Sequence, residues 1–107
     1  MTTARFDELI HAPIRLRICA TLAAVDSAAF STVKAMLGVS DSVLSKHIAV
    51  LESAGYLVVR KHTVLSRVYT SLALTPAGRT ALRGHLAALR DIAELASPDG
   101  RGVGRAR

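Results

Sequence analysis

The residues best suited to chemistry lie in a serine-rich stretch near the middle of the chain. Ser42, Ser45 and Lys46 fall on one side of a helical repeat, and the apolar Leu44 and Ile48 fall on the other. Short hydroxyl side chains and a lysine can hydrogen-bond base edges in the major groove of a duplex, whereas an acidic surface would be repelled by phosphate. The spacing therefore favours nucleic-acid contact over an ordinary solvated helix surface, which is the alternative interpretation.

A basic stretch follows and contains no acidic residue to offset it. The chain holds no Asp or Glu between Glu52 and Asp91, so this surface carries charge of one sign. Such a surface suits a phosphate backbone, although similar charges also keep the exposed edge of a β-hairpin soluble. The basic residues of this stretch that we expect to matter are Arg60, Lys61, His62 and Arg67.

No set of residues indicates catalysis or metal binding. The four histidines are dispersed, and no two of them are four residues apart. Cys19 is the single cysteine, which excludes an internal disulfide and a multi-cysteine cluster. Its place among apolar residues favours a core position over redox sensing. We therefore expect no enzyme, no metal site and no cofactor.

The composition is that of a single basic domain. The chain has 107 residues, half of them hydrophobic, with 14 Lys and Arg against 8 Asp and Glu and a net charge of +6. This length predicts one domain, and the charge indicates an anionic partner such as nucleic acid or an acidic membrane surface. Aromatic residues make up only 4%, which argues against stacking platforms for single strands.

Nothing in the sequence predicts a membrane span or an export signal. The longest mainly apolar run covers residues 18–25, far short of the roughly 20 residues that cross a bilayer. Asp7 and Glu8 would lie in the basic region of a signal peptide, and cleavage would remove a well-patterned helix. Together with the single cysteine, these features predict a cytoplasmic protein.

Helical periodicity organises the start of the chain. A short turn is predicted over residues 6–11 and a helix over residues 13–25, with Pro13 suited to the first helical position and Val25 on the apolar stripe. Residues 28–30 are too few for more than a short strand or bridge.

Two further helices follow. Ser31 or Thr32 is predicted to cap a helix over residues 33–37, and the glycine after it ends the helix in a left-handed conformation. Ser40 is predicted to cap a third helix, residues 40–54, which the next glycine stops.

The second half of the chain changes to a β period. Residues 56–60 and 67–74, joined by a basic loop over residues 61–66, predict a β-hairpin. Thr75 and Pro76 then open a last helix with a broad apolar face that runs to about residue 96.

This order of elements, with the sequence from Val33 to Tyr56, resembles that of small winged-helix regulators. A small residue, a turn glycine and a buried valine precede a helix ending in Leu-Glu-Ser-Ala-Gly-Tyr, and residues 67–92 resemble the second wing strand and dimer helix of the same group. The chain is similar to the MarR and ArsR families over roughly residues 12–95. The resemblance implies an α+β, mostly helical winged helix-turn-helix with a three-helix core, a hairpin wing and a C-terminal dimerisation helix.

The resemblance also implies a transcriptional regulator that reads a pseudo-palindromic operator as a homodimer. Helix 40–54 would enter the major groove, and the wing over residues 60–67 would lie on the backbone or in the minor groove of double-stranded DNA. Val64 and Leu65 occupy the wing tip, where such families often carry Gly or Arg. The residues expected to contact DNA are Ser31, Thr32, Lys34, Ser40, Ser42, Ser45, Lys46, His47, Ala49, Arg60, Lys61, His62 and Arg67.

The last helix carries more apolar surface than the core and wing can cover, which predicts a second copy of the chain against it. Apolar residues near the N-terminus would join this dimer interface, and a small-molecule effector would bind there. The residues expected at the interface are Phe6, Leu9, Ile10, Leu82, His85, Leu86, Leu89, Ile92 and Ala93.

Two other functions fit the same sequence. A winged-helix module whose third helix binds protein would associate with little dependence on salt, unlike a DNA binder. A non-specific architectural DNA binder would rely on the Gly- and Arg-rich residues 97–107, which we expect to be a disordered basic tail following a domain of residues 1–96.

Overall fold

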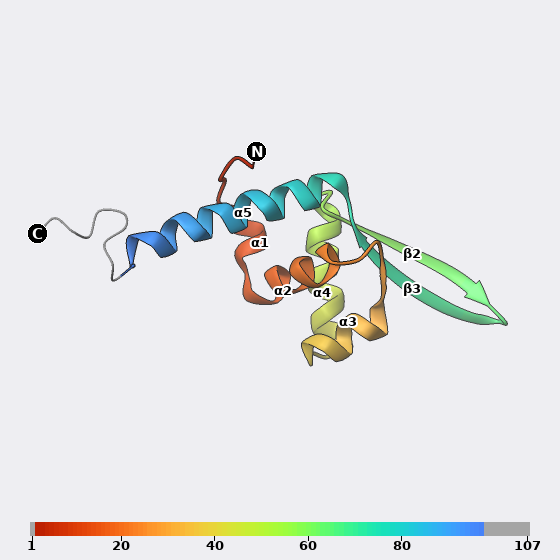
Figure 1. Ribbon diagram of the computed structural model, residues 1–107. Helices are drawn as coiled ribbons and strands as arrows, with labels where there is room; N and C mark the ends of the chain where they lie inside the picture. Colours follow the sequence, from red (N-terminus) through yellow and green to blue (C-terminus); the bar gives the residue numbers. More distant parts are fainter. Residues whose placement is uncertain (1, 98–107) are drawn as a thin grey trace, which may run out of the picture.

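The computed structural model describes residues 2–97, and Figure 1 shows a helical core from which a two-stranded hairpin and one long helix project. This confirms the expected α+β, mostly helical winged helix-turn-helix. The basic tail predicted over residues 97–107 lies outside the described residues, apart from Ser97. The elements are α1 (Glu8–His11), α2 (Pro13–Ala23), β1 (Ala28–Ala29), α3 (Phe30–Leu37), α4 (Asp41–Ser53), β2 (Leu57–Val64), β3 (Arg67–Leu74) and α5 (Pro76–Leu95).

The core consists of apolar residues that the helical periodicity placed on inner faces. Ile18 and Leu22 of α2 are fully buried with Val33 of α3 and Leu44 of α4. Cys19 is buried among them, and burial raises the pKa of its thiol to about 11, so the thiol stays protonated at neutral pH. This agrees with the prediction that Cys19 is a small core residue.

Helix α2 ends two residues earlier than predicted, and Val25 is exposed instead of extending the apolar stripe. The reason lies in α5. Arg79 donates hydrogen bonds to the carbonyl of Ala23 at 3.1 Å and to the carbonyl of Val25 at 2.8 Å. Carbonyls at a helix end lack partners within the helix, so a basic side chain from elsewhere can satisfy them.

Helix α3 begins three residues earlier than predicted, at Phe30, directly after β1. Ala29 occupies the cap position and no side chain caps the helix, so the prediction that Ser31 or Thr32 is the cap is wrong. Pairing of β1 with β3 holds the chain in an extended conformation up to Ala29, and the helix starts where that pairing stops. Ser31 and Thr32 instead lie in the first turn with exposed side chains.

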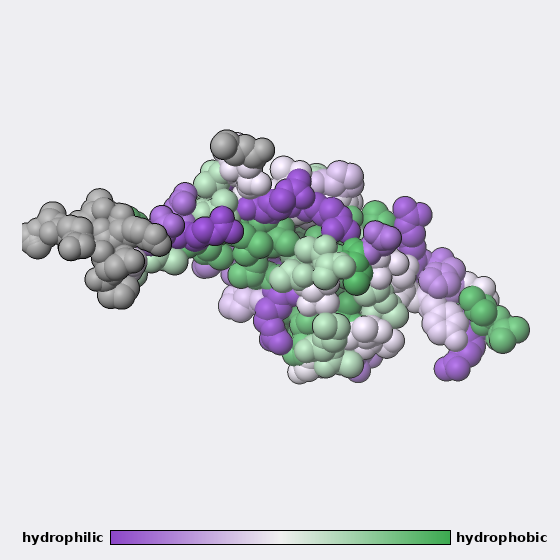
Figure 2. Space-filling view, in the orientation of Figure 1, coloured by the Kyte–Doolittle hydropathy of each residue, from purple (hydrophilic) through white to green (hydrophobic). Residues whose placement is uncertain are grey.

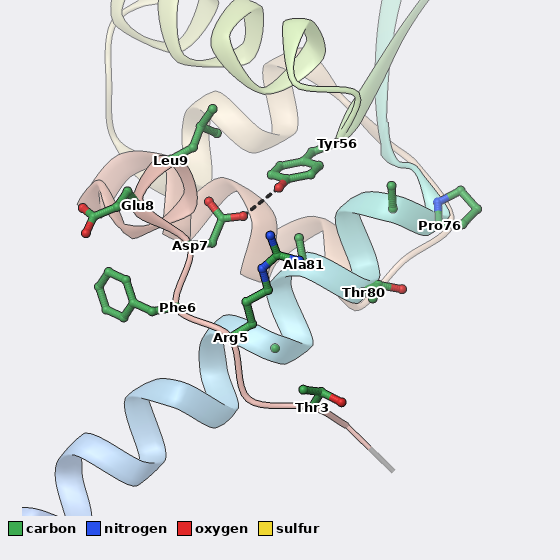
Figure 3. Close-up of a pocket in the computed structure, with 12 residues that line it drawn as sticks. Thr3, Arg5, Phe6, Asp7, Glu8, Leu9, Tyr56, Pro76, Thr80 and Ala81 are labelled. Carbon is green, nitrogen blue, oxygen red and sulfur yellow. Dashed lines mark hydrogen bonds between the residues drawn. The ribbon is translucent and has the colours of Figure 1, made fainter.

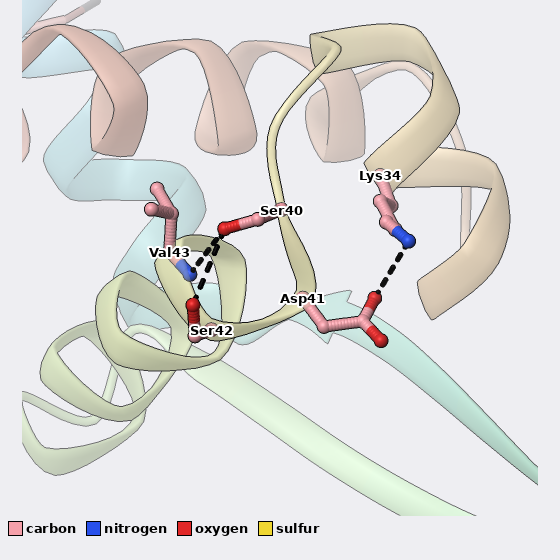
Figure 4. Close-up of polar contacts among 5 residues, drawn as sticks. All are labelled: Lys34, Ser40, Asp41, Ser42 and Val43. Carbon is pink, nitrogen blue, oxygen red and sulfur yellow. Dashed lines mark hydrogen bonds and ion pairs between the residues drawn. The ribbon is translucent and has the colours of Figure 1, made fainter.

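The turn between α3 and α4 follows the sequence prediction. Gly38 ends α3 with a φ of 68°, a conformation that favours glycine. Ser40 caps α4, because its Oγ accepts a hydrogen bond from the amide of Val43 at 3.2 Å (Figure 4). The start of α4 is therefore fixed by local interactions.

The wing is longer and its turn tighter than predicted. Strand β2 pairs antiparallel with β3 along its whole length, so the predicted loop over residues 61–66 is a turn of only two residues, Leu65 and Ser66. Both have positive φ, the backbone conformation that matches the twist of hairpin strands. Strand β1 adds to the other edge of β3 and gives the order β1-β3-β2.

Helix α5 starts against the base of the wing. The hydroxyl of Thr75 accepts a hydrogen bond from the amide of Gly78 at 3.0 Å and donates one to the carbonyl of Gly55 at 2.6 Å. Gly78 approaches the chain so closely that a Cβ there would overlap the carbonyl oxygen of Tyr56. The helix runs to Leu95, close to the predicted end. Within residues 2–97, no helix is long and apolar enough to cross a membrane.

Replacing Gly78 by alanine should destabilise the fold, because the new methyl group would overlap the backbone where α5 meets the wing. We expect the free energy of unfolding in urea to fall by about 3 kcal/mol despite the better helix propensity of alanine. Gly84→Ala is the matched control in the same helix. The atoms nearest to its Cβ would belong to Thr3 and Arg5, at 3.1 Å or more, and we expect a change below about 1 kcal/mol. Equal stability of the two variants would contradict the close approach.

Candidate nucleic-acid interface

The exposed face of α4 carries the side chains predicted to read bases. Ser42, Ser45, Lys46 and Ala49 are exposed, while Leu44, Ile48 and Leu51 on the other side of α4 are buried in the core. Lys46 stands near the middle of this face. The free surface of the helix is therefore the one that the sequence predicted, and its contact with DNA stays a prediction.

The start of α4 combines a structural role with an exposed polar surface. The Oγ of Ser40 accepts from the amide of Val43 and also lies 3.3 Å from the Oγ of Ser42 (Figure 4). Ser40, predicted as a DNA contact, thus serves first as the helix cap. The positive end of the helix dipole favours a phosphate at such a position.

Lys34 forms an ion pair that the sequence did not predict. Its Nζ lies 2.9 Å from Oδ1 of Asp41, which joins α3 to α4 (Figure 4). Both side chains keep much of their surface exposed, so the pair contributes at most about 1 kcal/mol to stability. The pair reduces the charge that Lys34 can offer to phosphate. Its two members lie in different helices, and helical periodicity does not reveal such a pair.

His47 points toward α2 and the N-terminal segment. Its Nδ1 lies 3.1 Å from a guanidinium nitrogen of Arg15, whose Nε donates to the carbonyl of Leu9 at 2.6 Å. Burial lowers the pKa of His47, and the charges of Arg15 and Lys46 lower it further. The neutral ring accepts the arginine hydrogen bond, so His47 links α4 to α2, and its contact with DNA stays a prediction.

A groove separates α4 from the wing, and the strand register decides which wing residues face it. Lys61 and Thr70 are paired across the strands and line the groove opposite Ser45 and Ala49. Glu52 also lines it, so the groove is less basic than the acid-free stretch that follows in the sequence. Lys61 is the predicted wing contact that lies nearest to the exposed face of α4.

The remaining wing contacts lie on the opposite face of the hairpin, because successive side chains of a strand alternate. Arg60 and His62 flank Lys61 in β2, and the ring of His62 stacks on Tyr69 with centroids 6.0 Å apart. Arg67 opens β3 opposite Val64. The structure therefore divides the four predicted basic contacts between the two faces of the wing.

Three of the residues predicted at a dimer interface are buried inside the chain. Ile10 and Leu82 belong to the hydrophobic core, and His85 is buried where the N-terminal segment and α1 pack against α5. The prediction that they face a partner is corrected. Among the other members of the predicted interface, Phe6, Leu86, Ile92 and Ala93 are exposed. Leu9 and Leu89 are half-buried.

The structure brings together two histidines that are far apart in the sequence. Nε2 of the fully buried His85 lies 3.1 Å from Nδ1 of His11, and the ring of Phe6 packs against both. Nδ1 of His85 accepts a hydrogen bond from the amide of Asp7 at 3.0 Å. His85 therefore carries its proton on Nε2 and donates it to His11. Among residues 2–97, no group of three or more His, Cys, Asp or Glu could hold a metal ion.

Asp7 completes this cluster. Its Oδ2 accepts a hydrogen bond from the hydroxyl of Tyr56 at 2.7 Å (Figure 3), and its Oδ1 accepts one from the amide of Ile10 at 3.0 Å. Burial alone would raise the pKa of Asp7, but the hydrogen bonds of Tyr56 and the α1 backbone outweigh it and lower the pKa. The carboxylate stays charged and fixes the N-terminal segment to the base of the wing.

The chain belongs to the family of winged helix DNA-binding domains, whose family model matches residues 14–93. The match includes α4 and the whole wing, the two parts that carry the exposed serines and the basic residues. This is a family of DNA-binding domains and not of enzymes, as the sequence predicted.

The chain is also similar to individual proteins. A transcriptional regulator homologue from Pyrococcus horikoshii superposes with a TM-score of 0.79 and 25% identity, over 85% of this chain and 90% of that chain. A MarR family transcriptional regulator from Silicibacter pomeroyi shares the fold, with a TM-score of 0.63 and 24% identity over 89% of this chain and 61% of that chain. The uncharacterized protein MJ0432 of Methanocaldococcus jannaschii is 27% identical over 79 residues, 74% of this chain and 86% of its own length.

The buried His85 predicts a pH-dependent stability. Burial, followed by the neighbouring His11, lowers the pKa of His85 below its ordinary 6.5, while the nearby Asp7 and Glu8 oppose the shift. The unfolded chain then binds a proton that the folded chain excludes, so stability is complete above pH 6.5 and falls as the pH decreases below it.

We expect the thermal unfolding midpoint to decrease between about pH 7.5 and about pH 5.5, above the range in which carboxylates titrate. In His85→Asn the decrease should be smaller, because the amide keeps a hydrogen-bond acceptor without titrating in this range. His62→Asn, on the distant wing, is the control and should retain the decrease of the parent chain. The same decrease in His85→Asn as in the parent would contradict this role.

Proposed function

We propose that the protein is a transcriptional regulator that binds operator DNA as a homodimer. The observation that carries this proposal is the exposed face of α4, with Ser42, Ser45 and Lys46, beside a wing that holds basic but no acidic residues. A helix of this kind fits the major groove, and the wing then meets the neighbouring backbone or minor groove. The likeness to a transcriptional regulator homologue supports a regulatory role.

Base recognition should be limited by the side chains that α4 offers. Asn and Gln are the usual bidentate partners of adenine, and the chain contains neither. Lys46 can donate to O6 and N7 of guanine, the serines can donate or accept, and Ala49 can meet the methyl group of thymine. We infer a site with one strongly preferred guanine in each half and shallow preferences elsewhere, completed by the shape of the DNA.

The occupant that we propose for the exposed apolar side of α5 is a second copy of the chain. Leu86 is 40% exposed and Ile92 is 52% exposed, with Leu95 beyond them and Phe6 alongside. The last turns of α5, which carry Ile92 and Leu95, extend past the core (Figure 1), and more than half of each of these two side chains is exposed. A two-fold pairing through α5 would place two α4 helices on one face for half-sites about one helical turn apart.

An effector site at this interface is part of the proposal. A groove between the N-terminal segment and α5 is lined by Arg5, Phe6, Tyr56 and Thr80 (Figure 3). Because Phe6 borders both the groove and the exposed apolar side of α5, a small molecule bound there would contact the dimer interface.

Selection of bound duplexes from a random library with the full chain tests DNA binding, and salt titration tests its electrostatic part. Lys46→Ala should weaken binding to the selected site by roughly 1–3 kcal/mol and affect random DNA much less. Replacing Arg60, Lys61 and Arg67 together by alanine should flatten the slope of log affinity against log salt by up to about three units.

Arg83→Ala removes a charge from α5 and is the matched control. It should leave the preference for the selected site over random DNA unchanged and alter the salt slope by no more than about one unit. Failure to select any duplex, with binding insensitive to salt, would favour a protein-interaction module. Binding without sequence preference that disappears when the residues after Ser97 are removed would favour an architectural DNA binder.

Replacing Leu86 and Ile92 together by lysine should yield monomers, because two charges would stand on the proposed interface. Sedimentation equilibrium should show the shift to monomer, and affinity for the selected site should fall although the charge added is positive. Val25→Lys is the control, since it adds a charge at an exposed position on the loop after α2. A parent chain that is already monomeric at micromolar concentration would exclude the dimer.

A further inference from the structure

The tip of the wing is an exposed apolar surface. Leu65 is 91% exposed and Val68 is 67% exposed, and Val64, directly before Leu65, has half of its surface exposed. Figure 2 shows this apolar end beyond the hydrophilic part of the wing. The tip is the part of the hairpin farthest from the core, and none of these residues belongs to the hydrophobic core.

The backbone at the tip is unfavourable for the residues that occupy it. Leu65 has a φ of 51° and Ser66 a φ of 67°, both in the left-handed region. Two-residue hairpin turns of this conformation strongly prefer Asn-Gly or Asp-Gly, because a larger side chain crowds the backbone. Leu65 therefore stabilises the fold neither by burial nor by its conformation, and a local conflict of this kind indicates a contact outside the chain.

The surroundings of the tip select the kind of partner. Lys61 lies on one face of the hairpin and Arg60 on the other, Arg67 adjoins Val64 in the ladder, and the hairpin from residue 57 to residue 74 contains no acidic residue. This combination of an apolar end and basic sides matches minor-groove binding, in which cations meet the phosphates and an apolar side chain enters between base steps.

The length of the wing also fits. The five residues Arg60–Val64 are the exposed part of β2 and span roughly 16 Å at the usual rise of a strand. The minor groove next to an occupied major groove lies about half a helical turn away, roughly 17 Å along the duplex. With α4 in the major groove, the wing tip can reach the next minor groove.

We propose that Leu65, flanked by Val64 and Val68, is an apolar wedge that enters the minor groove beside each half-site and partly unstacks one base step. The wedge favours pyrimidine–purine steps, which unstack most readily, and it bends the duplex toward the major groove. It adds specificity at a position that α4 does not touch. This inference rests on the proposed DNA binding and extends it to the DNA that flanks the major-groove contacts.

The test compares two variants of Leu65 in the full chain. Leu65→Asn removes the apolar surface and suits the left-handed backbone, so it keeps the hairpin folded. Leu65→Met keeps an apolar side chain of similar volume and is the matched control. The probe is a duplex carrying the library-selected site, with dyes at its ends to report bending and 2-aminopurine at the flanking steps to report unstacking.

For Leu65→Asn we expect a loss of affinity of about tenfold, less bending of the duplex, and no increase in 2-aminopurine fluorescence on binding. Leu65→Met should behave nearly like the parent chain. The slope of log affinity against log salt should not change, because no charge is removed. Replacing the flanking pyrimidine–purine step should weaken the parent chain and leave Leu65→Asn unaffected.

Parental affinity and bending in Leu65→Asn would overturn the wedge while leaving DNA binding intact, and a parent chain that binds no duplex would instead overturn the proposed function. Vesicles containing phosphatidylserine provide the second arm. Vesicle binding by the parent that is lost in Leu65→Asn, with unchanged DNA binding, would assign the tip to a membrane and overturn the proposal.

Discussion

The hydrogen bonds of Asp7 hold three distant parts of the chain together. Its carboxylate caps α1 through the amide of Ile10 and binds the hydroxyl of Tyr56, and its amide donates to the buried ring of His85. Replacing the side chain would remove the acceptors of the Ile10 amide and the Tyr56 hydroxyl, whereas the backbone amide would still donate to His85. Both the backbone and the side chain of Asp7 therefore help to hold α1 against α5 and the base of the wing.

Tyr56 carries the same connection into the wing. Its amide donates to the carbonyl of Leu51 at the end of α4, and its carbonyl accepts from the amide of Thr75 just before α5. Close contact with Gly78 leaves little freedom at this junction. The helix proposed to read DNA, the base of the wing and the helix proposed to pair two copies therefore meet at one residue. In such a dimer, the distance between two α4 helices would be determined through this junction.

The charges of the proposed DNA surface are distributed unevenly. Lys46 is the one Lys or Arg of α4, Lys34 is paired with Asp41, and Glu52 lines the groove beside the wing. Attraction to phosphate must therefore come largely from the wing, where basic side chains occupy both faces. Such a division would assign sequence reading to Lys46 and the short polar side chains of α4, and the larger part of the affinity to the hairpin.

The sequence by itself determined the helices, their order and the exposed face of α4, because periodicity, the cap at Ser40 and the glycine at position 38 act within a few residues. It also determined the family, through the run from α3 to the wing. Only the tertiary structure decided that Ile10 and His85 are buried. Asp7 and His11, the hydrogen-bond partners of His85, lie more than seventy residues away from it in the chain. The tight turn at Leu65 was equally hidden, since leucine and serine are not the residues that such turns prefer, and pairing along the whole hairpin imposes the conformation. Signals that act within a few residues can be recognised from the sequence, whereas burial and strand register depend on which distant segments pack together.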